Sequence, residues 1–397
     1  MEVVPRKRRP YSTLEKLEMK KTLVALAALA SVSAFAQSTV TISGYFDRGW
    51  VKSDNSNNLK DSVGVGSNAG TTAIKISAVS DLGQGLKASF MSETNPGDLG
   101  GITQDAAAVA SVTTQQGGFN NGESFLGLSG GFGEIRLGSP NNEILTTTTG
   151  VAAPGLSTGV GSTYSSSWSI FNGVGTGATG AVGILVASAP GTSGGGVRGI
   201  RQANTIKYVS PNFNGLRFAY GMAGKVNNGS TSTIDSAGFT DMSVRYTNGP
   251  LDVMYASLKI DTNTTDTLNS QVSGTGVTAA GATYTHSMLG ASYALGSLKF
   301  HAGAGGTKSS DTLVSTSGTT YGVSYTMGQI DLMANVASAN DKATTDNDRK
   351  MTGLGVNYNL SKTTRAYLRY DNLNYNTKAA ASGSELKRTA IGVSTSF

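Results

Sequence analysis

Short segments in which apolar and polar residues alternate recur along the chain from Val40 to Phe397. Clear examples are LRFAY at 216–220 and AYLRY at 366–370. A repeat of two residues predicts β-strands with one apolar and one polar face. The polar face carries Lys, Arg or Asp near the middle of many of these strands, whereas a sandwich would turn only its apolar faces to a shared core. This pattern is typical of a transmembrane barrel with an apolar outside and a polar interior.

The first residues of the chain have the pattern of a secretory signal peptide. Met19 and two lysines precede the apolar run 22–32 and an A-x-A sequence at 34–36, so we expect cleavage after Ala36. Met19 is the expected true start, with a longer leader from Met1 as the alternative. Residues 1–36 are then extension and signal peptide, and 37–397 form one barrel domain. No apolar run after residue 36 approaches the roughly 18 residues that a membrane helix needs.

The basic charge of the chain comes largely from this leader. The whole sequence has a formal net charge of +6, and residues 1–36 carry seven Lys and Arg against three Glu. The mature chain gives no argument for a nucleic-acid partner. There is no cysteine and there are two histidines, so a thiolate metal site is excluded. No G-x-S-x-G motif is present, and we expect no enzyme activity, no cofactor and no metal.

Tight turns and long polar loops alternate between the expected strands, as in barrels with short turns on one side and long loops on the other. Counting between the turns gives about sixteen strands, and a barrel of this size leaves an aqueous channel. The expected strands are 40–52, 71–82, 84–95, 122–131, 133–139, 203–210, 214–224, 239–248, 250–260, 284–295, 297–307, 318–327, 329–339, 350–360, 363–374 and 387–397.

Residues 140–200 interrupt this pattern. They show neither a clean alternation nor an amphipathic helix, and before the last three residues they hold one charged side chain, Glu143. Long stretches without regular structure inside a compact protein are usually functional or disordered. We predict that this third loop folds into the lumen after the fifth strand and narrows it by bulk and backbone dipoles. Trp168, Ile170 and Phe171 are expected to pack against the wall.

Strand parity assigns charged side chains to the interior, because an Arg or Lys facing lipid at mid-membrane costs about 2–4 kcal/mol. The predicted pore-lining or constriction residues are Lys75, Lys87, Glu93, Glu134, Arg136, Glu143, Lys207, Arg217 and Arg369. The same parity adds Asp47, Arg245, Asp252, Lys299, Asp331, Arg365 and Arg388. Leaving out the third loop, the set holds ten basic and five acidic residues, which predicts a mild preference for anions. For any single member, a solvated residue without a measurable role is the alternative.

Five stretches of the chain resemble the Gram-negative general porins. They are VTISGYFDRGW (40–50), SDLGQGLKASFMSE (80–93), FLGLSGGFGEIRLGSP (125–140), ANTIKYVSPNFNGLRFAYG (203–221) and AIGVSTSF (390–397). The resemblance implies a homotrimer of 16-stranded barrels in the Gram-negative outer membrane, surrounded by lipid and lipopolysaccharide. It implies passive diffusion of small solutes and ions, a third loop folded inward, and a terminal Phe397 that barrel-assembly machinery reads.

The chain departs from the family pattern at charged positions. Ala73, Gly122 and Ser139 stand where the family usually carries inward arginines, and the third loop offers Glu143 where the family has several acids. We therefore expect a modest electric field across the pore, with Lys75 as the candidate substitute on the second strand. Two other functions stay open: a surface barrel acting mainly as an adhesin or anchor, and a substrate-specific channel.

Overall fold

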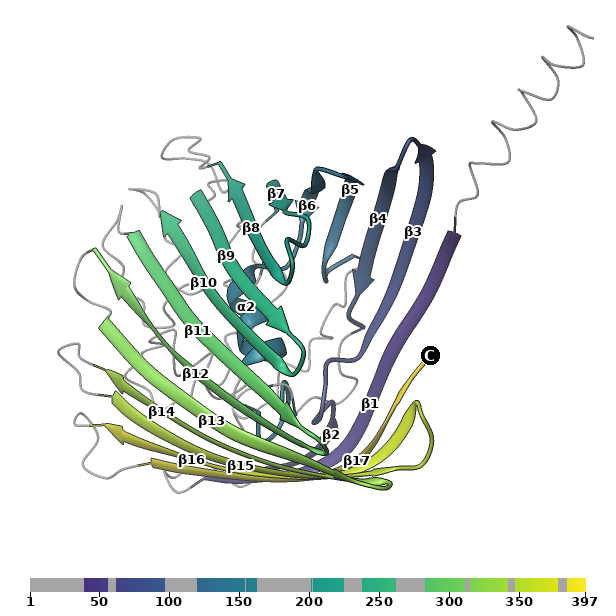
Figure 1. Cartoon of the computed structure of the whole chain (residues 1–397). Coiled ribbons are helices and arrows are strands. Elements are labelled where there is room, and N and C mark those ends of the chain that lie inside the picture. The colour runs from purple at the N-terminus through teal and green to yellow at the C-terminus, as the bar shows by residue number, and fades with distance from the viewer. Residues whose placement is uncertain are drawn as a thin grey trace, which may run out of the picture.

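The computed structural model describes residues 39–55, 62–96, 120–153, 155–162, 201, 203–224, 238–261, 283–310, 315–341, 347–377 and 384–397. Within them, seventeen strands form a single antiparallel sheet that closes on itself (Figure 1). The strands are β1 (Thr39–Asn55), β2 (Ser62–Gly66), β3 (Ala73–Gly83), β4 (Leu86–Thr94), β5 (Ser124–Gly130), β6 (Gly133–Ser139), β7 (Thr205–Val209), β8 (Leu216–Ala223), β9 (Gly238–Asn248), β10 (Leu251–Asp261), β11 (Thr283–Leu295), β12 (Leu298–Ser309), β13 (Ser315–Met327), β14 (Ile330–Asp341), β15 (Asn347–Asn359), β16 (Thr364–Thr377) and β17 (Ser384–Ser396). A short α-helix, α2 (Glu143–Thr146), continues into a π-helix, η2 (Thr147–Val151). No helix in this part of the chain is long and apolar enough to cross a membrane.

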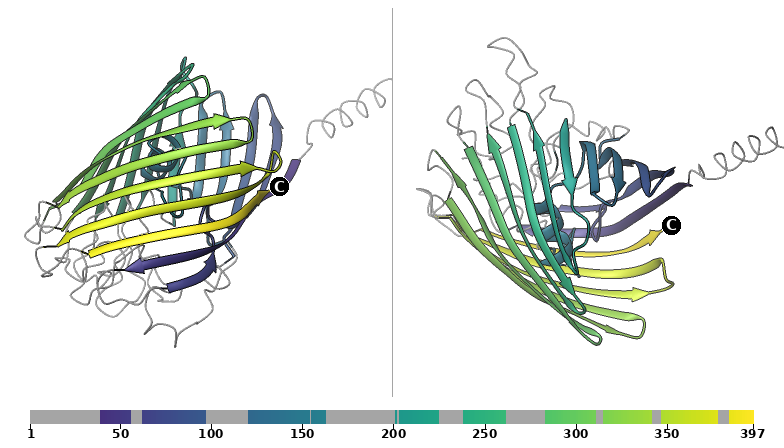
Figure 2. Two further views of the ribbon diagram at one scale, coloured as in Figure 1. Left: turned by 90° about the horizontal axis from the view of Figure 1, so that it is seen from below. Right: turned by 45° about the horizontal axis from the view of Figure 1, so that its top comes forward.

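The ring closes between the first and last strands. β17 pairs with β1 from Ser396 opposite Tyr45 to Leu386 opposite Asn55, and Figure 2 shows the yellow last strand beside the purple first one. β2 and β3 pair with successive parts of β1, so together they fill one position in the ring. The seventeen strands therefore give the sixteen-stranded barrel that the alternation predicts.

Residues 62–66 form β2, although the sequence pattern placed them in a long loop, and that expectation is wrong. Val63 and Val65 are exposed on the same face as Trp50. The alternate positions are Ser62, Gly64 and Gly66, so a single polar residue marks the alternation. A strand of five residues with glycine on one face carries too weak a signal to be recognised.

Large apolar side chains on the outer face confirm the strand parity. Strand parity turns the residues that alternate with the expected interior residues to the outside, and five of these, Leu86, Phe90, Leu137, Tyr208 and Leu216, are exposed. Several aromatic side chains share this exposed face: Trp50, Tyr246, Tyr293, Tyr325, Tyr358 and Phe397. Their placement in aromatic belts at the two membrane surfaces is a prediction, with the ordinary preference of Tyr for strands as the alternative.

The wall is interrupted between β2 and β3. β1 pairs with β3 as far as Tyr45 and with β2 from Gly49, so the backbone of Asp47 has no strand partner on this side. Thr72 Oγ1 accepts the N–H of Asp47 at 3.2 Å, and the Ser67 hydroxyl donates to the Asp47 carbonyl at 3.2 Å. Arg48 Nη1 donates to the same carbonyl at 2.8 Å. Side chains thus replace the missing hydrogen bonds of the sheet, as buried backbone groups require.

Candidate functional site

After β6, residues 140–153 and 155–162 run along the inner face of the barrel, opposite the exposed apolar side chains; we call them the inward segment. The Asn142 side chain caps α2 by accepting the Leu145 N–H at 2.8 Å. The hydroxyls of Thr147, Thr148 and Thr149 each donate to the carbonyl four residues earlier at 2.8 Å. The expectation that this region holds no helix is wrong here, because one α-helical turn is too short to produce a periodic pattern.

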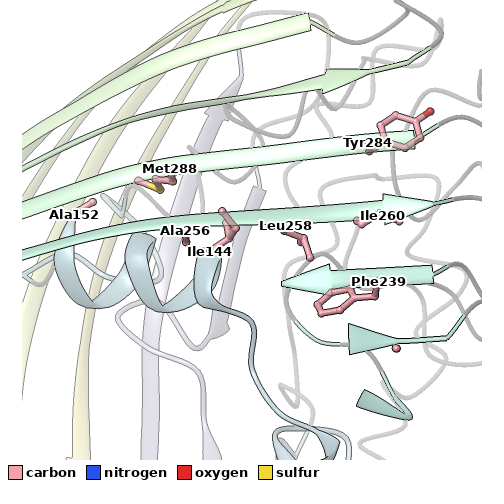
Figure 3. Close-up of a cluster of buried hydrophobic side chains, with 9 residues drawn as sticks. Ile144, Ala152, Phe239, Ala256, Leu258, Ile260, Tyr284 and Met288 are labelled. Carbon is pink, nitrogen blue, oxygen red and sulfur yellow. The ribbon is translucent and has the colours of Figure 1, made fainter. Parts of the chain in front are cut away.

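The inner wall beneath this helix is apolar. Ile144 and Ala152 belong to one buried cluster with Ala256 and Leu258 of β10 and with Met288 of β11 (Figure 3). The expected polar lining is therefore wrong for this part of the wall. The inward segment covers it, so apolar side chains there are removed from water and stabilise the contact.

Small residues let the segment approach the sheet. A Cβ added at Gly303 of β12 would lie 2.9 Å from the Cβ of Ala152, closer than real Cβ contacts allow. Further along, a Cβ at Gly353 of β15 would collide with the carbonyl oxygen of Gly161. Because these two strand residues are glycines, the chain of the inward segment can lie directly against the sheet.

Four polar side chains fix the beginning of the inward segment; we call Glu143, Lys207, Asp241 and Ser243 the root cluster. Lys207 Nζ forms an ion pair with the Glu143 carboxylate and lies 3.3 Å from Asp241 Oδ2. Asp241 accepts the backbone N–H of Glu143 at 3.0 Å, and Ser243 donates to Glu143 Oε2 at 2.9 Å. Lys207 and Asp241 are 2% and 1% exposed. Buried charges of this kind persist when they are paired and hydrogen-bonded.

The sequence identified only half of this cluster. Glu143 and Lys207 are among the predicted pore-lining residues, and the structure brings them together. Asp241 and Ser243 were missed, although they alternate with exposed Met242 and Val244 and so share the face of Arg245. The same parity rule, applied at every second position before Arg245, would have placed both on the inner face.

Lys75 and Glu93 face each other across β3 and β4. Lys75 Nζ lies 2.9 Å from Glu93 Oε2, and the two side chains are 42% and 9% exposed. The basic partner therefore reaches solvent while the acid is covered. Lys87, on β4, is exposed.

Glu134 and Arg136 form a second pair on β6. Arg136 Nη2 lies 2.7 Å from Glu134 Oε2, and its guanidinium lies 4.7 Å from the centre of the Phe125 ring. Arg217 of β8 is exposed and stands opposite Arg245 in the sheet.

Arg369 of β16 lies under the inward segment. It is 2% exposed, and its guanidinium lies 5.8 Å from the ring centre of Tyr367. A Cβ at Gly355 would collide with this guanidinium and lie 2.8 Å from Leu156, which places Arg369 beside the segment. The nine predicted residues differ in exposure: Lys87 and Arg217 are exposed, Lys75, Glu134, Arg136 and Glu143 are partly exposed, and Glu93, Lys207 and Arg369 are buried. A pore-lining role for each remains a prediction.

The far end of the described inward segment, residues 155–162, is its tip. The Gly161 N–H donates to Asp371 Oδ2 at 2.8 Å, and Arg388 Nε donates to Asp371 Oδ1 at 3.0 Å. Val160 is buried in a cluster with Val51 and Tyr367. Asp371 was not predicted, although the alternation of β16 puts it on the face of Arg369.

Some predictions lie outside the described residues. They are the signal peptide at 1–36 and the part of the third loop beyond residue 162, including Trp168, Ile170 and Phe171. Within the described ranges, no group of three or more His, Asp or Glu could hold a metal ion.

A family model described as Gram-negative porin matches residues 22–378 of the chain. The chain belongs to the Gram-negative porin family. This porin is 31% identical over 359 residues to outer membrane porin protein 32 of Delftia acidovorans, covering 88% of each chain. It is 34% identical over 140 residues to the major outer membrane protein P.IB of Neisseria gonorrhoeae, 34% of this chain and 36% of that protein.

Solved structures of outer membrane proteins share the fold. The anion-selective porin from Comamonas acidovorans matches with a TM-score of 0.67 and 24% identity, covering 91% of this porin and 100% of that chain. The trimer form of OmpT of Vibrio cholerae, folded in vitro, matches with a TM-score of 0.58 and 14% identity, covering 91% and 99%. Together with the family model, the closed barrel makes this porin a channel of the Gram-negative outer membrane.

Proposed function

We propose that this porin is a passive diffusion channel for small hydrophilic solutes and ions, with a mild preference for anions. The observation that carries the preference is an asymmetry of exposure on the inner face. Lys87 and Arg217 are exposed and Lys75 is 42% exposed, whereas Asp47 and Asp241 are 0% and 1% exposed. Permeating ions therefore meet more positive than negative charge, and charge near a pore tunes which ions enter.

The inward segment is the proposed constriction. Its described part touches the inner wall at α2, where the root cluster holds it, and again at the tip beside Asp371. A segment attached at both points reduces the open cross-section along its whole path. Its acid, Glu143, is paired with Lys207, so the narrowing acts through bulk more than through charge.

A homotrimer is the proposed assembly. The support is membership of the porin family and the likeness of the fold to the solved trimer form of OmpT. Phe397 is exposed and stacks on Phe46, with 5.8 Å between the ring centres, so it is accessible to barrel-assembly machinery. Contacts with lipid and lipopolysaccharide are proposed for the exposed apolar face.

Reversal potentials in a salt gradient across planar bilayers test the proposal. We expect the wild type to favour anions and Lys75→Ala and Arg136→Ala to weaken that preference. Lys259→Ala is the matched control, because Lys259 has the same charge but shares the face of exposed Tyr255. Clear cation selectivity of the wild type would contradict the proposal. A complete lack of conductance would favour an adhesin or anchor.

A further inference from the structure

We propose that Asp47 is a positioning residue that sets the bore of the channel by holding residues 67–72, which in turn hold the tip of the inward segment. Residues 67–72 are the chain between β2 and β3, and we call them the bracket. The inference rests on the proposed role of the inward segment as the constriction. It concerns which residues hold that segment in place.

Asp47 fixes the bracket through its carboxylate. Oδ2 accepts the backbone N–H groups of Ala69 at 2.6 Å and Gly70 at 2.9 Å. Oδ1 accepts the hydroxyl of Tyr367 at 2.6 Å. Hydrogen bonds to an ionised acceptor are among the strong ones, and three of them converge on this side chain. The bracket is thereby tied to β1 and to β16.

A second tie comes from the bracket itself. Asn68 Nδ2 donates to the carbonyl oxygens of Gly49 at 2.8 Å and Gly66 at 2.9 Å. These carbonyls lie on β1 and at the end of β2. The side chain of Asn68 thus bonds to the barrel wall, and its backbone carbonyl is available to the tip.

The bracket then holds the tip. The carbonyl of Asn68 accepts the N–H of Val160 at 2.8 Å. Val160 is 3% exposed and shares a buried cluster with Ala69 of the bracket and with Val51. Gly159 has a φ of +82°, and a Cβ there would collide with the Asn68 carbonyl. Close approach of two backbones requires glycine at this point.

Asp47 differs from the other acid at the tip. Asp371 also accepts an N–H from the tip, but it forms an ion pair with Arg388, so it has a partner whether or not the tip is attached. Asp47 is 0% exposed, and no ion pair of Asp47 occurs in the described part of the chain. A buried carboxylate without a cation is costly unless hydrogen bonds satisfy it, and for Asp47 two of the three donors belong to the bracket.

Single-channel recording of Asp47→Asn tests the proposal, because Asn keeps the shape but loses the charge and one acceptor. We expect open-channel current noise to rise several-fold and partly closed levels to appear. Asp81→Asn is the matched control: Asp81 is an acid near the end of β3 that also accepts a backbone N–H, from Gly83 at 2.8 Å, and the same loss of charge there should leave the current quiet. A folded Asp47→Asn barrel as quiet as Asp81→Asn would overturn the proposal.

Paired cysteines give a second test that does not need conductance. The chain has no cysteine, so Ala69→Cys/Val160→Cys is a clean background. We expect it to form a disulfide on mild oxidation, read as a gel shift, because Ala69 and Val160 lie in one buried cluster. Disulfides need Cα atoms within about 7 Å of each other. Ala69→Cys/Ala152→Cys is the control, since Ala152 lies against Gly303, and it should not cross-link.

The disulfide also tests the role of Asp47 directly. In Asp47→Asn carrying Ala69→Cys/Val160→Cys, oxidation should restore the quiet current and reduction should bring the noise back. Noise that persists after complete oxidation would overturn the proposal. If the wild type does not conduct but Ala69→Cys/Val160→Cys still cross-links, the proposed channel function is contradicted and the attachment of the tip is not. If the wild type conducts but Ala69→Cys/Val160→Cys does not cross-link, the attachment is contradicted and the channel function is not.

Discussion

The inward segment is held in two different ways at its two ends. At the root, a buried lysine lies between two carboxylates, and a serine hydroxyl completes the set. At the tip, the Gly161 N–H donates to the Asp371 carboxylate, and the other contacts are a backbone hydrogen bond, an apolar side chain and two glycines. The segment's own charged side chain, Glu143, therefore fixes the root, whereas the tip is held through its backbone and one apolar side chain.

The difference determines what each end tolerates. Removing one member of a buried charge cluster leaves its partners uncompensated, so the loss is large whatever the size of the new side chain. The tip contributes backbone and an apolar side chain to its contacts, so within the tip itself an added methyl group is the damaging change. Changes within the segment should therefore act through charge at the root and through shape at the tip, and a lost charge affects the tip only through the residues that hold it, Asp371 and, by way of the bracket, Asp47.

The largest expected effect is at the root. Lys207→Met keeps most of the side-chain volume but takes the cation from the buried carboxylate of Asp241 and the partly buried carboxylate of Glu143. We expect the free energy of unfolding to fall by about 3–5 kcal/mol, measured by thermal or denaturant unfolding in detergent. Lys259→Met is the control, because its pair with Asp261 at 3.2 Å is largely exposed and is worth about 0–1 kcal/mol. Equal losses in the two variants would remove the distinction between the root and an ordinary surface pair.

The next effect is at the tip. Gly353→Ala adds a methyl group where the Gly161 carbonyl oxygen lies, and overpacking of this kind costs about 1–3 kcal/mol. We expect the tip to shift, with a lower melting temperature and an altered single-channel conductance. Gly131→Ala is the matched control, since a Cβ there has open space. Unchanged conductance in Gly353→Ala would show that the tip does not bound the channel.

The smallest expected effect is Val160→Ala, which keeps every backbone hydrogen bond and removes two methyl groups from the buried cluster. The loss should be about 1–2 kcal/mol and should fall on the tip rather than on the whole barrel. Hydrogen exchange at residues 155–162 measures it, because exchange reports local opening. Val63→Ala, a change of the same size on the exposed face, should leave exchange at the tip unchanged. Faster exchange throughout the sheet would contradict a local effect.

The outer face of this porin could be predicted from the sequence and the inner face only in part. Contact with lipid requires an apolar side chain at every second position, so residues such as Phe90 and Leu137 report their orientation directly. The inner face obeys no such rule, because its character depends on what covers it. Leu258 faces inward but is apolar since the inward segment lies on it, and Arg369 faces inward but is buried.

Contacts between distant residues account for most of what was missed. Asp241 and Ser243, the two partners of Glu143 that were missed, lie 98 and 100 residues from it. Strand parity can place them on the inner face, but no spacing along the chain indicates that they meet Glu143. The bracket was missed for a related reason: residues 67–72 look like a polar loop until their partners on β1 are known.

The hydrogen bond between Asp47 and Tyr367 has a consequence for the order in which this porin folds. It joins residues 320 positions apart in the chain, and the bond from Gly161 to Asp371 spans 210. Contacts of such long range form late, because a large loss of chain entropy precedes them. Tyr367 can reach Asp47 only after β17 has met β1. The conductance of a refolding sample should therefore reach its final value after the strands have formed, in the last step of closure.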